Sequence, residues 1–280
     1  MSRIDGVFES LKRRGEKALI PYITCGDPDI AATKDLIFEL EAQGADIIEL
    51  GIPFSDPIAD GPTIQRASMR ALEGGIKLSK ILRMIEEVKG EDSGYSWRVE
   101  IPLVVMSYYN PIFHYGVEKF IRDFRCAGGD GIIIPDLPTD EAEEVLAGGK
   151  KYGVDIIFLL SPTSNEERIK KICDASSGYI YYVSVLGVTG EREFLNRSLS
   201  DKVKFIKRFT NKPVAVGFGI STPEQARSVA SVADGVIVGS AIIRIIEENL
   251  NSPKMVKKVG KFLRELKRGM KGACGKHKNA

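Results

Sequence analysis

The sequence predicts an α/β protein folded as a closed (β/α)8 barrel, the TIM-barrel architecture, with an extra N-terminal helix and additional helices. Eight short apolar segments are each followed by a stretch with helical character, a pattern typical of parallel strands buried on both faces. Gly, Pro and polar residues concentrate after each segment, where a barrel builds its site. A doubly wound sheet also fits the strand count, but the number eight and the rich loops favour the barrel.

The first half of the chain alternates predicted strands and helices. Ile4, Phe8 and Leu11 lie at helical spacing within residues 2–14, and we expect this helix to cover one end of the barrel. Strands are expected at 19–24, 47–50, 103–106 and 131–134, and helices at 29–43, 62–73, 78–89, 116–127 and 139–151. The charged segment 90–100 is expected to be a surface excursion.

The second half continues the alternation. Strands are expected at 155–160, 179–183, 213–216 and 235–238, and helices at 165–174 and 200–209, from Thr222 onward, and to about 268. The Thr222 helix carries cap, proline and box residues in order. Residues 191–200 are polar and are expected to form a mobile flap. Residues 1–268 are predicted to be a single domain, with 269–280 as a disordered basic tail.

The composition excludes several classes of function. The chain has 280 residues, 43% of them hydrophobic, and its 40 basic and 38 acidic residues give a net charge of +2. This balance indicates no nucleic-acid or membrane partner. No apolar run approaches the ~20 residues of a membrane span, and the first residues lack a signal-peptide pattern, so the expected location is cytoplasmic.

Metal and disulfide sites are not favoured. The four cysteines are far apart, without a Cys-x-x-Cys pair, and the chain has two histidines. Cys25 follows a strand and is interpreted as a small buried hydrophobe rather than a nucleophile. His114, placed in the loop after a strand, is interpreted as a loop histidine rather than a general base. We predict no metal.

The segment 46–63 is the strongest candidate for chemistry. Glu49 lies in an otherwise apolar strand, where a carboxylate costs free energy unless it is paired or protonated. Three prolines and two glycines follow within a dozen residues and predict a rigid loop that carries Asp56 and Asp60. Glu49 and Asp60 could act as paired acid and base. They could instead be a structural carboxylate and a turn cap.

Glycine-bearing turns follow the last three predicted strands, at 187–190, 217–219 and 239–240. Glycine lets backbone N–H groups approach an anion closely, and a helix that starts after the turn adds its positive dipole end. One such turn is ordinary, but three at neighbouring strand ends predict a phosphate site. Between this site and the carboxylates, the strand ends offer side chains suited to a flat apolar group: Tyr22, Tyr108, Ile133, Leu159, Tyr181 and Phe218.

The motifs of the chain resemble those of the tryptophan synthase alpha subunit family. The most specific is Ile-Glu-Leu-Gly-Ile-Pro-Phe-Ser-Asp-Pro-Ile-Ala-Asp-Gly-Pro at 48–62. Further matches, in family order, are Tyr-Tyr-Asn at 108–110, Asp-Leu-Pro at 136–138, Gly-Val-Thr-Gly at 187–190, Gly-Phe-Gly-Ile-Ser at 217–221 and Gly-Ser-Ala at 239–241. Departures are small, such as Tyr22 where phenylalanine is more frequent.

The resemblance implies a lyase of tryptophan biosynthesis that cleaves indole-3-glycerol phosphate to indole and glyceraldehyde 3-phosphate. It implies no cofactor in this chain, and a beta subunit that holds pyridoxal phosphate within an alpha2-beta2 assembly. The implied catalytic residues are Glu49, Asp60 and Tyr181. The implied substrate-binding residues are Tyr22, Ile64, Tyr108, Ile133, Leu159, Thr189, Gly190, Gly217, Phe218, Gly219, Gly239 and Ser240.

Three alternatives remain open at this point. The chain could be a free-standing lyase with the same chemistry and no partner. It could be an inactive barrel that only binds or regulates a partner, although Glu49 and Asp60 together argue against this. It could also be another sugar-phosphate isomerase or aldolase, although the predicted strand ends carry no lysine for a Schiff base.

Overall fold

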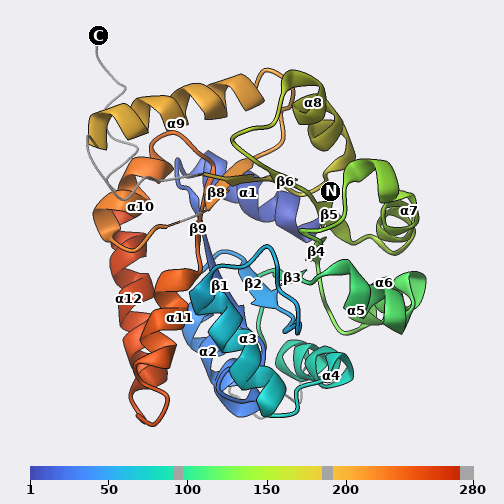
Figure 1. The fold of residues 1–280 in the computed structure, drawn as a ribbon. Helices are drawn as coiled ribbons and strands as arrows, with labels where there is room; N and C mark the ends of the chain where they lie inside the picture. Colours follow the sequence, from blue (N-terminus) through green and yellow to red (C-terminus); the bar gives the residue numbers. More distant parts are fainter. Residues whose placement is uncertain (91–96, 185–191, 218, 272–280) are drawn as a thin grey trace.

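The strands of the computed structural model form a single sheet in which all neighbours are parallel (Figure 1). The structure describes residues 1–90, 97–184, 192–217 and 219–271, without the side chains of 192–197. Within these residues the strands are β1 (Ala18–Thr24), β2 (Ile48–Gly51), β3 (Leu103–Met106), β4 (Gly131–Ile133), β5 (Asp155–Ile157), β6 (Leu159–Leu160), β7 (Ile180–Val183), β8 (Val214–Gly217) and β9 (Gly235–Val238).

Helices surround the strands (Figure 1). The first group is α1 (Arg3–Arg13), α2 (Ile30–Ala42), α3 (Pro62–Glu73), α4 (Leu78–Lys89), α5 (Tyr109–Tyr115) and α6 (Val117–Cys126). The second is α7 (Glu143–Tyr152), α8 (Glu166–Ala175), α9 (Arg192–Ile206), α10 (Pro223–Ala230), α11 (Ser240–Glu247) and α12 (Met255–Met270), with a short 3₁₀ turn at Thr139–Glu141. The predicted barrel with its extra helices is confirmed.

The barrel closes through the break between β5 and β6. The sheet order is β5-β4-β3-β2-β1-β9-β8-β7-β6, so these two strands end the list although Phe158 alone separates them in the chain. The Tyr181 N–H donates to the Phe158 carbonyl at 3.3 Å, which continues the pairing across the break. The single strand predicted at 155–160 is therefore one interrupted strand, and the predicted eight-stranded closure is confirmed.

Alternation along each strand separates two apolar layers. On β1, Ala18 and Ile20 point into the barrel, whereas Leu19 and Ile23 pack against the surrounding helices. The inner layer is closed at one end by α1, whose Ile4, Phe8 and Leu11 are buried with the inner strand residues. The helix predicted at 2–14 therefore covers one end of the barrel, as expected.

Two predicted loops are wrong. Residues 109–115 form α5, because Pro111 falls in the first turn, where a helix does not need the missing N–H. Residues 192–199 belong to α9 instead of a mobile flap, since polar residues such as Glu and Arg are compatible with an outer helix. The helix predicted at 139–151 is divided into the 3₁₀ turn and α7, and α12 runs through Met270.

The surface excursion is confirmed where the structure describes it. Trp97 is 54% exposed, and its ring packs edge-on against that of Phe38 with 6.1 Å between the ring centroids. The Val99 N–H donates to Val88, which returns the chain to the barrel. Residues 91–96 and the tail at 272–280 lie outside the described residues, so the disorder of the tail and the boundaries of the single domain stay predictions.

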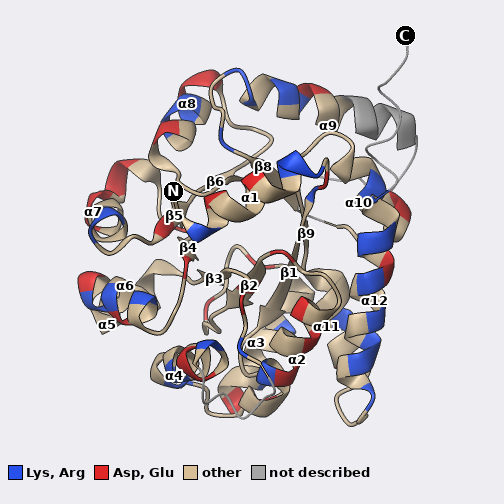
Figure 2. Cartoon of the chain, turned by 180° about the vertical axis from the view of Figure 1, so that it is seen from behind, with Lys and Arg blue, Asp and Glu red and all other residues tan. Residues whose placement is uncertain are grey.

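Charged side chains are spread over the outer helices. Figure 2 shows basic and acidic residues interspersed on most of them, with basic residues prevailing on α12. This distribution fits the small net charge of +2. Among the described residues, no helix combines the length and apolarity needed to cross a membrane.

Replacing Phe8 by Ala should destabilise the protein by roughly 3–5 kcal/mol, because it leaves a cavity at the closed end of the barrel. Phe8 is 6% exposed and its ring lies 5.8 Å from that of Tyr179. The neighbouring exposed residue Glu9 provides the control, Glu9→Ala, which should change stability by less than about 0.5 kcal/mol. Urea unfolding measures both, and equal stabilities would contradict the capping role of α1.

Candidate active site

Glu49 is a fully buried carboxyl group on β2. Its Oε1 accepts a hydrogen bond of 2.8 Å from the Tyr179 hydroxyl, and its Oε2 has no hydrogen-bond partner among the described residues. Burial raises the pKa of Glu49 to about 8, against a smaller lowering by the Tyr179 hydrogen bond. The group therefore keeps a proton near neutral pH and has one oxygen available to a substrate, as an acid–base catalyst requires.

Asp60 lies in the loop between β2 and α3 and is partly buried. Its Oδ2 accepts a hydrogen bond of 3.2 Å from the Tyr108 hydroxyl, which in turn accepts the Ala59 N–H at 2.8 Å. Burial raises the pKa of Asp60, and the bond from Tyr108 opposes this. Tyr108 follows β3, so a barrel strand holds the loop that carries the second carboxyl group.

Tyr22 and Tyr181 are two buried phenols that both carboxyl groups influence. Burial is the main cause of the raised pKa of each tyrosine, and the charges of both Glu49 and Asp60 contribute. Since electrostatic influence of this kind requires proximity, both carboxyl groups lie near the two tyrosines. Tyr22 also aligns with Glu49 in the pairing of β1 and β2. The pairing of Glu49 and Asp60 in one site stays a prediction.

Two glycines make room for these tyrosines. A Cβ on Gly51 would lie 2.0 Å from the Tyr22 hydroxyl, and one on Gly217 would lie 2.9 Å from the Tyr181 hydroxyl. A side chain at either position would displace the tyrosine. Gly217 therefore contributes to the site because its lack of a side chain leaves room for the Tyr181 hydroxyl.

The glycine turns after β8 and β9 are neighbours, because Gly217 pairs with Ile237 in the sheet. Gly219 has a φ of +71°, which favours glycine. Gly239 precedes the first turn of α11, which begins at Ser240 and presents backbone N–H groups without intrahelical partners. A Cβ on Gly239 would lie 3.4 Å from Tyr22, so this turn adjoins the tyrosine wall. Thr189, Gly190 and Phe218 lie outside the described residues.

The remaining predicted pocket residues lie on the inner wall or at its edge. Ile133 is fully buried in the inner layer, and Leu159 packs on the same layer and pairs with Tyr181. Ile64, near the start of α3, is partly buried. Together with Tyr22 and Tyr181 they give the inner wall an apolar character suited to an aromatic ring.

Comparisons with known proteins identify the family. A family model described as tryptophan synthase alpha chain matches residues 8–271. The chain belongs to the tryptophan synthase alpha chain family. A curated relative of that name from Geotalea uraniireducens (strain Rf4) is 50% identical over 275 residues, which cover 98% of this chain and 100% of the relative.

Solved structures agree with this membership of the tryptophan synthase alpha chain family. The crystal structure of tryptophan synthase subunit alpha from Legionella pneumophila str. Paris has a TM-score of 0.88 at 40% identity, and the match covers 97% of this chain and 99% of that one. A chain from tryptophan synthase of M. tuberculosis in its aminoacrylate-bound form gives 0.84 at 37%, covering 96% and 100%. The resemblance inferred from the motifs is confirmed.

Tyr179 is a site residue that the sequence analysis missed. It lies within the strand predicted at 179–183, but the family resemblance implies only Tyr181 of this strand as a catalytic residue. Residues two apart on a strand share a face, so both tyrosines point into the barrel, and Tyr179 alone has a hydrogen bond to Glu49. The alternation of inward and outward side chains along this strand could have indicated Tyr179.

The structure also shows the surroundings of two other residues considered for catalysis, Cys25 and His114. Cys25 is fully buried, and burial raises the pKa of its thiol to about 12, so it is a packed hydrophobe as interpreted. His114 is an exposed residue of α5, which corrects its predicted place in a loop. In the part of the chain that the structure describes, no cluster of three or more His, Cys, Asp or Glu side chains could hold a metal.

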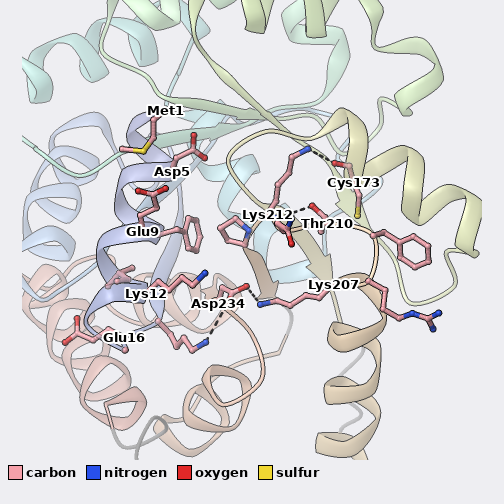
Figure 3. Close-up of a pocket in the computed structure, with 18 of the residues that line it drawn as sticks. Met1, Asp5, Glu9, Lys12, Glu16, Cys173, Lys207, Thr210, Lys212 and Asp234 are labelled. Carbon is pink, nitrogen blue, oxygen red and sulfur yellow. Dashed lines mark hydrogen bonds and ion pairs between the residues drawn. The ribbon is translucent and has the colours of Figure 1, made fainter.

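A cavity of about 1140 Å³ lies beside α1 (Figure 3), and neither Glu49 nor Asp60 lines it. Its charged side chains stabilise the fold. Asp234 forms ion pairs with Lys207 at 2.6 Å and Lys17 at 3.6 Å, and Lys212 donates to the Cys173 carbonyl at 2.6 Å. Lys17, Lys212 and Asp234 lie just before β1, β8 and β9, so this cavity is at the amino ends of the strands. A barrel builds its site at the carboxyl ends, and we therefore place the active site of this family member at the opposite end.

The free energy of unfolding of the Glu49→Gln variant, relative to that of the parent, should increase as pH rises. The ordinary pKa of the group is 4.5 and its folded value is about 8. Between these values the unfolded chain is ionised while the folded protein keeps the proton, so the parent loses up to about 1.4 kcal/mol per pH unit. The loss ends above the folded pKa.

Urea unfolding at pH 5 and pH 8 measures this effect. The stability difference between Glu49→Gln and the parent should grow between the two pH values. Glu86→Gln, at an exposed position on α4, should show no such growth. A constant difference for Glu49→Gln would mean that the carboxyl group is ionised in the folded protein.

Proposed function

We propose that Glu49 and Asp60 are the two catalytic carboxyl groups with which this chain cleaves indole-3-glycerol phosphate to indole and glyceraldehyde 3-phosphate, the alpha reaction of tryptophan synthase. Membership of the family supports the reaction. The observation that carries the assignment of residues is the buried carboxyl group of Glu49, which has a pKa of about 8 and one oxygen without a partner among the described residues. The reaction class is carbon–carbon lyase, in tryptophan biosynthesis.

Glu49 moves two protons in the proposed mechanism. Its protonated form gives a proton to C3 of the indole ring, which makes the ring a leaving group. The resulting carboxylate then accepts the proton of the hydroxyl on the adjacent side-chain carbon. That carbon becomes the aldehyde carbonyl as its bond to C3 breaks, and the electron pair of the bond restores the neutral ring. Glu49 ends the cycle protonated, so the step balances.

Asp60 stabilises the charge that appears between these steps. Protonation at C3 places a positive charge on the ring nitrogen. A carboxylate that accepts a hydrogen bond from the ring N–H lowers the energy of this intermediate. Tyr108 holds the Asp60 carboxyl group through its hydroxyl. The tyrosine-lined wall fits the ring, and the Gly219 and Gly239–Ser240 turns would hold the phosphate.

The proposed chemistry uses no cofactor in this chain, and in the family pyridoxal phosphate belongs to the beta subunit. We propose assembly with such a subunit as alpha2-beta2. The cytoplasmic location expected from the sequence is part of the same proposal.

Glu49→Gln should lower kcat by at least about a thousandfold, because proton transfer to C3 is lost. Asp60→Asn should lower it by roughly a hundredfold or more, because the countercharge is lost. An assay of indole release measures both, and Glu73→Gln, an exposed carboxylate change on α3, should leave the rate unchanged. A near-parental rate for Glu49→Gln would remove it from the mechanism, and no cleavage by the parent would refute the function.

The surface beside the Asp60 loop supports a protein partner. Ile58 is 84% exposed and Phe113 is 59% exposed, and neighbouring exposed apolar side chains can mark a protein interface. The segments that carry them are joined by the hydrogen bond from the Ala59 N–H to Tyr108, which directly precedes α5. A subunit docked here would contact the loop of the second catalytic residue.

Phe113→Glu should weaken the stimulation of cleavage by a tryptophan synthase beta subunit at least about tenfold, because an aromatic contact is lost. Cleavage without the beta subunit should not change. Met69→Glu, which alters an equally exposed residue on α3, is the matched control and should keep the stimulation. Full-speed cleavage by the parent alone, with no stimulation, would favour the free-standing lyase.

A further inference from the structure

A network of four charged side chains joins three segments near the active-site mouth. Arg70 of α3 donates from Nε to Asp27 Oδ1 at 2.8 Å and from Nη2 to Asp27 Oδ2 at 2.9 Å. Its Nη1 donates to Glu247 Oε1 at 2.9 Å. Glu247, the last residue of α11, also accepts two bonds from Arg66 at 2.7 and 2.8 Å.

Arg70 is the member of the network whose charge water cannot replace, because its partner Asp27 is buried. Asp27 is fully buried, and burial raises its pKa against the opposing effect of Arg70. Without Arg70, a buried carboxylate would lose its only cation among the described residues. Arg66 is different, because its side chain is 51% exposed and it contacts Glu247 alone in the network. Exposed pairs of this kind contribute little.

Each segment in the network leads to a different part of the site. Asp27 lies three residues beyond β1, the strand that carries Tyr22. The Arg70 helix, α3, starts directly after the Asp60 loop, and its Gln65 donates to the Asp60 carbonyl at 2.9 Å. Glu247 ends the helix that begins at Ser240, beside the proposed phosphate turn. A helix of this length is a rigid rod of about 12 Å.

We propose that Arg70 is a positioning residue that sets the distance between Asp60 and the phosphate-binding start of α11. The proposal rests on the proposed function. A substrate with an aromatic ring at one end and a phosphate at the other engages both places at once, so the spacing between α3 and α11 decides its fit. Misplacement by about 1 Å can cost a hundredfold in rate.

Two probes that need no cleavage test this spacing. Indole-3-propanol phosphate spans both ends and lacks the hydroxyl groups of the substrate, whereas glycerol 3-phosphate reaches the phosphate turn only. For Arg70→Met we expect calorimetry to show about tenfold weaker binding of the spanning probe. Glycerol 3-phosphate should bind within about twofold of the parent, because the turn itself is built by the backbone of α11.

Matched variants separate positioning from charge. Arg66→Met removes a cation from the same helix and the same partner, and should leave both affinities and kcat within about twofold of the parent. Arg70→Lys keeps the charge but lacks the planar fork, so it should be intermediate. Circular dichroism at the assay temperature confirms that each variant is folded, and Arg70→Lys serves as the test if Arg70→Met does not fold.

The outcomes distinguish this inference from the proposed function. Unchanged binding of the spanning probe in the folded Arg70 variants would overturn the positioning role while leaving cleavage by the parent intact. Equal weakening of both probes would also overturn it, since the phosphate turn itself would then be damaged. A parent that binds the spanning probe but does not cleave the substrate would refute the function alone, because the probes still measure the spacing.

Discussion

The arrangement of the active site depends on one constraint, the burial of the Glu49 carboxyl group inside the barrel. Burial moves its pKa to about 8, and the hydrogen bond from Tyr179 engages one oxygen, whereas the other has no partner in the part of the chain that the structure describes. Tyr179 is held by Phe8, whose helix closes the far end of the barrel. The helix that closes the barrel therefore contacts the proposed catalytic group through Tyr179, so a residue that stabilises the fold also supports the proposed site.

The second carboxyl group is held differently, by connections across the surface of the mouth. Tyr108 fixes Asp60 from the side of β3. Arg70 fixes the following helix to the end of β1 and to α11. The loop itself is stiffened by Pro53, Pro57 and Pro62. A rigid inner carboxyl group and a braced outer one suit a reaction in which two charges must appear at fixed places on one substrate.

Most of the fold was predictable because its signals are local. Eight continuous apolar segments gave the strands, and glycines and caps marked many helix ends. The errors have the same origin. Tyr-Asn-Pro at 109–111 has turn character in isolation, yet it opens α5, and the polar residues from 192 onward form a helix instead of a flap. Local preference does not show whether a segment packs on a barrel.

The barrel class, the helix α1 that closes the barrel, the glycine turns and the two candidate carboxyl groups follow from local sequence, because each is encoded by residues that are near one another in the chain. The side chains that hold these groups in place depend on the folded barrel. The pairing of Tyr179 with Glu49 joins residues 130 positions apart, and that of Arg70 with Glu247 joins residues 177 apart. Closure of the barrel brings such residues together, and no periodicity or propensity within a short segment can specify those partners.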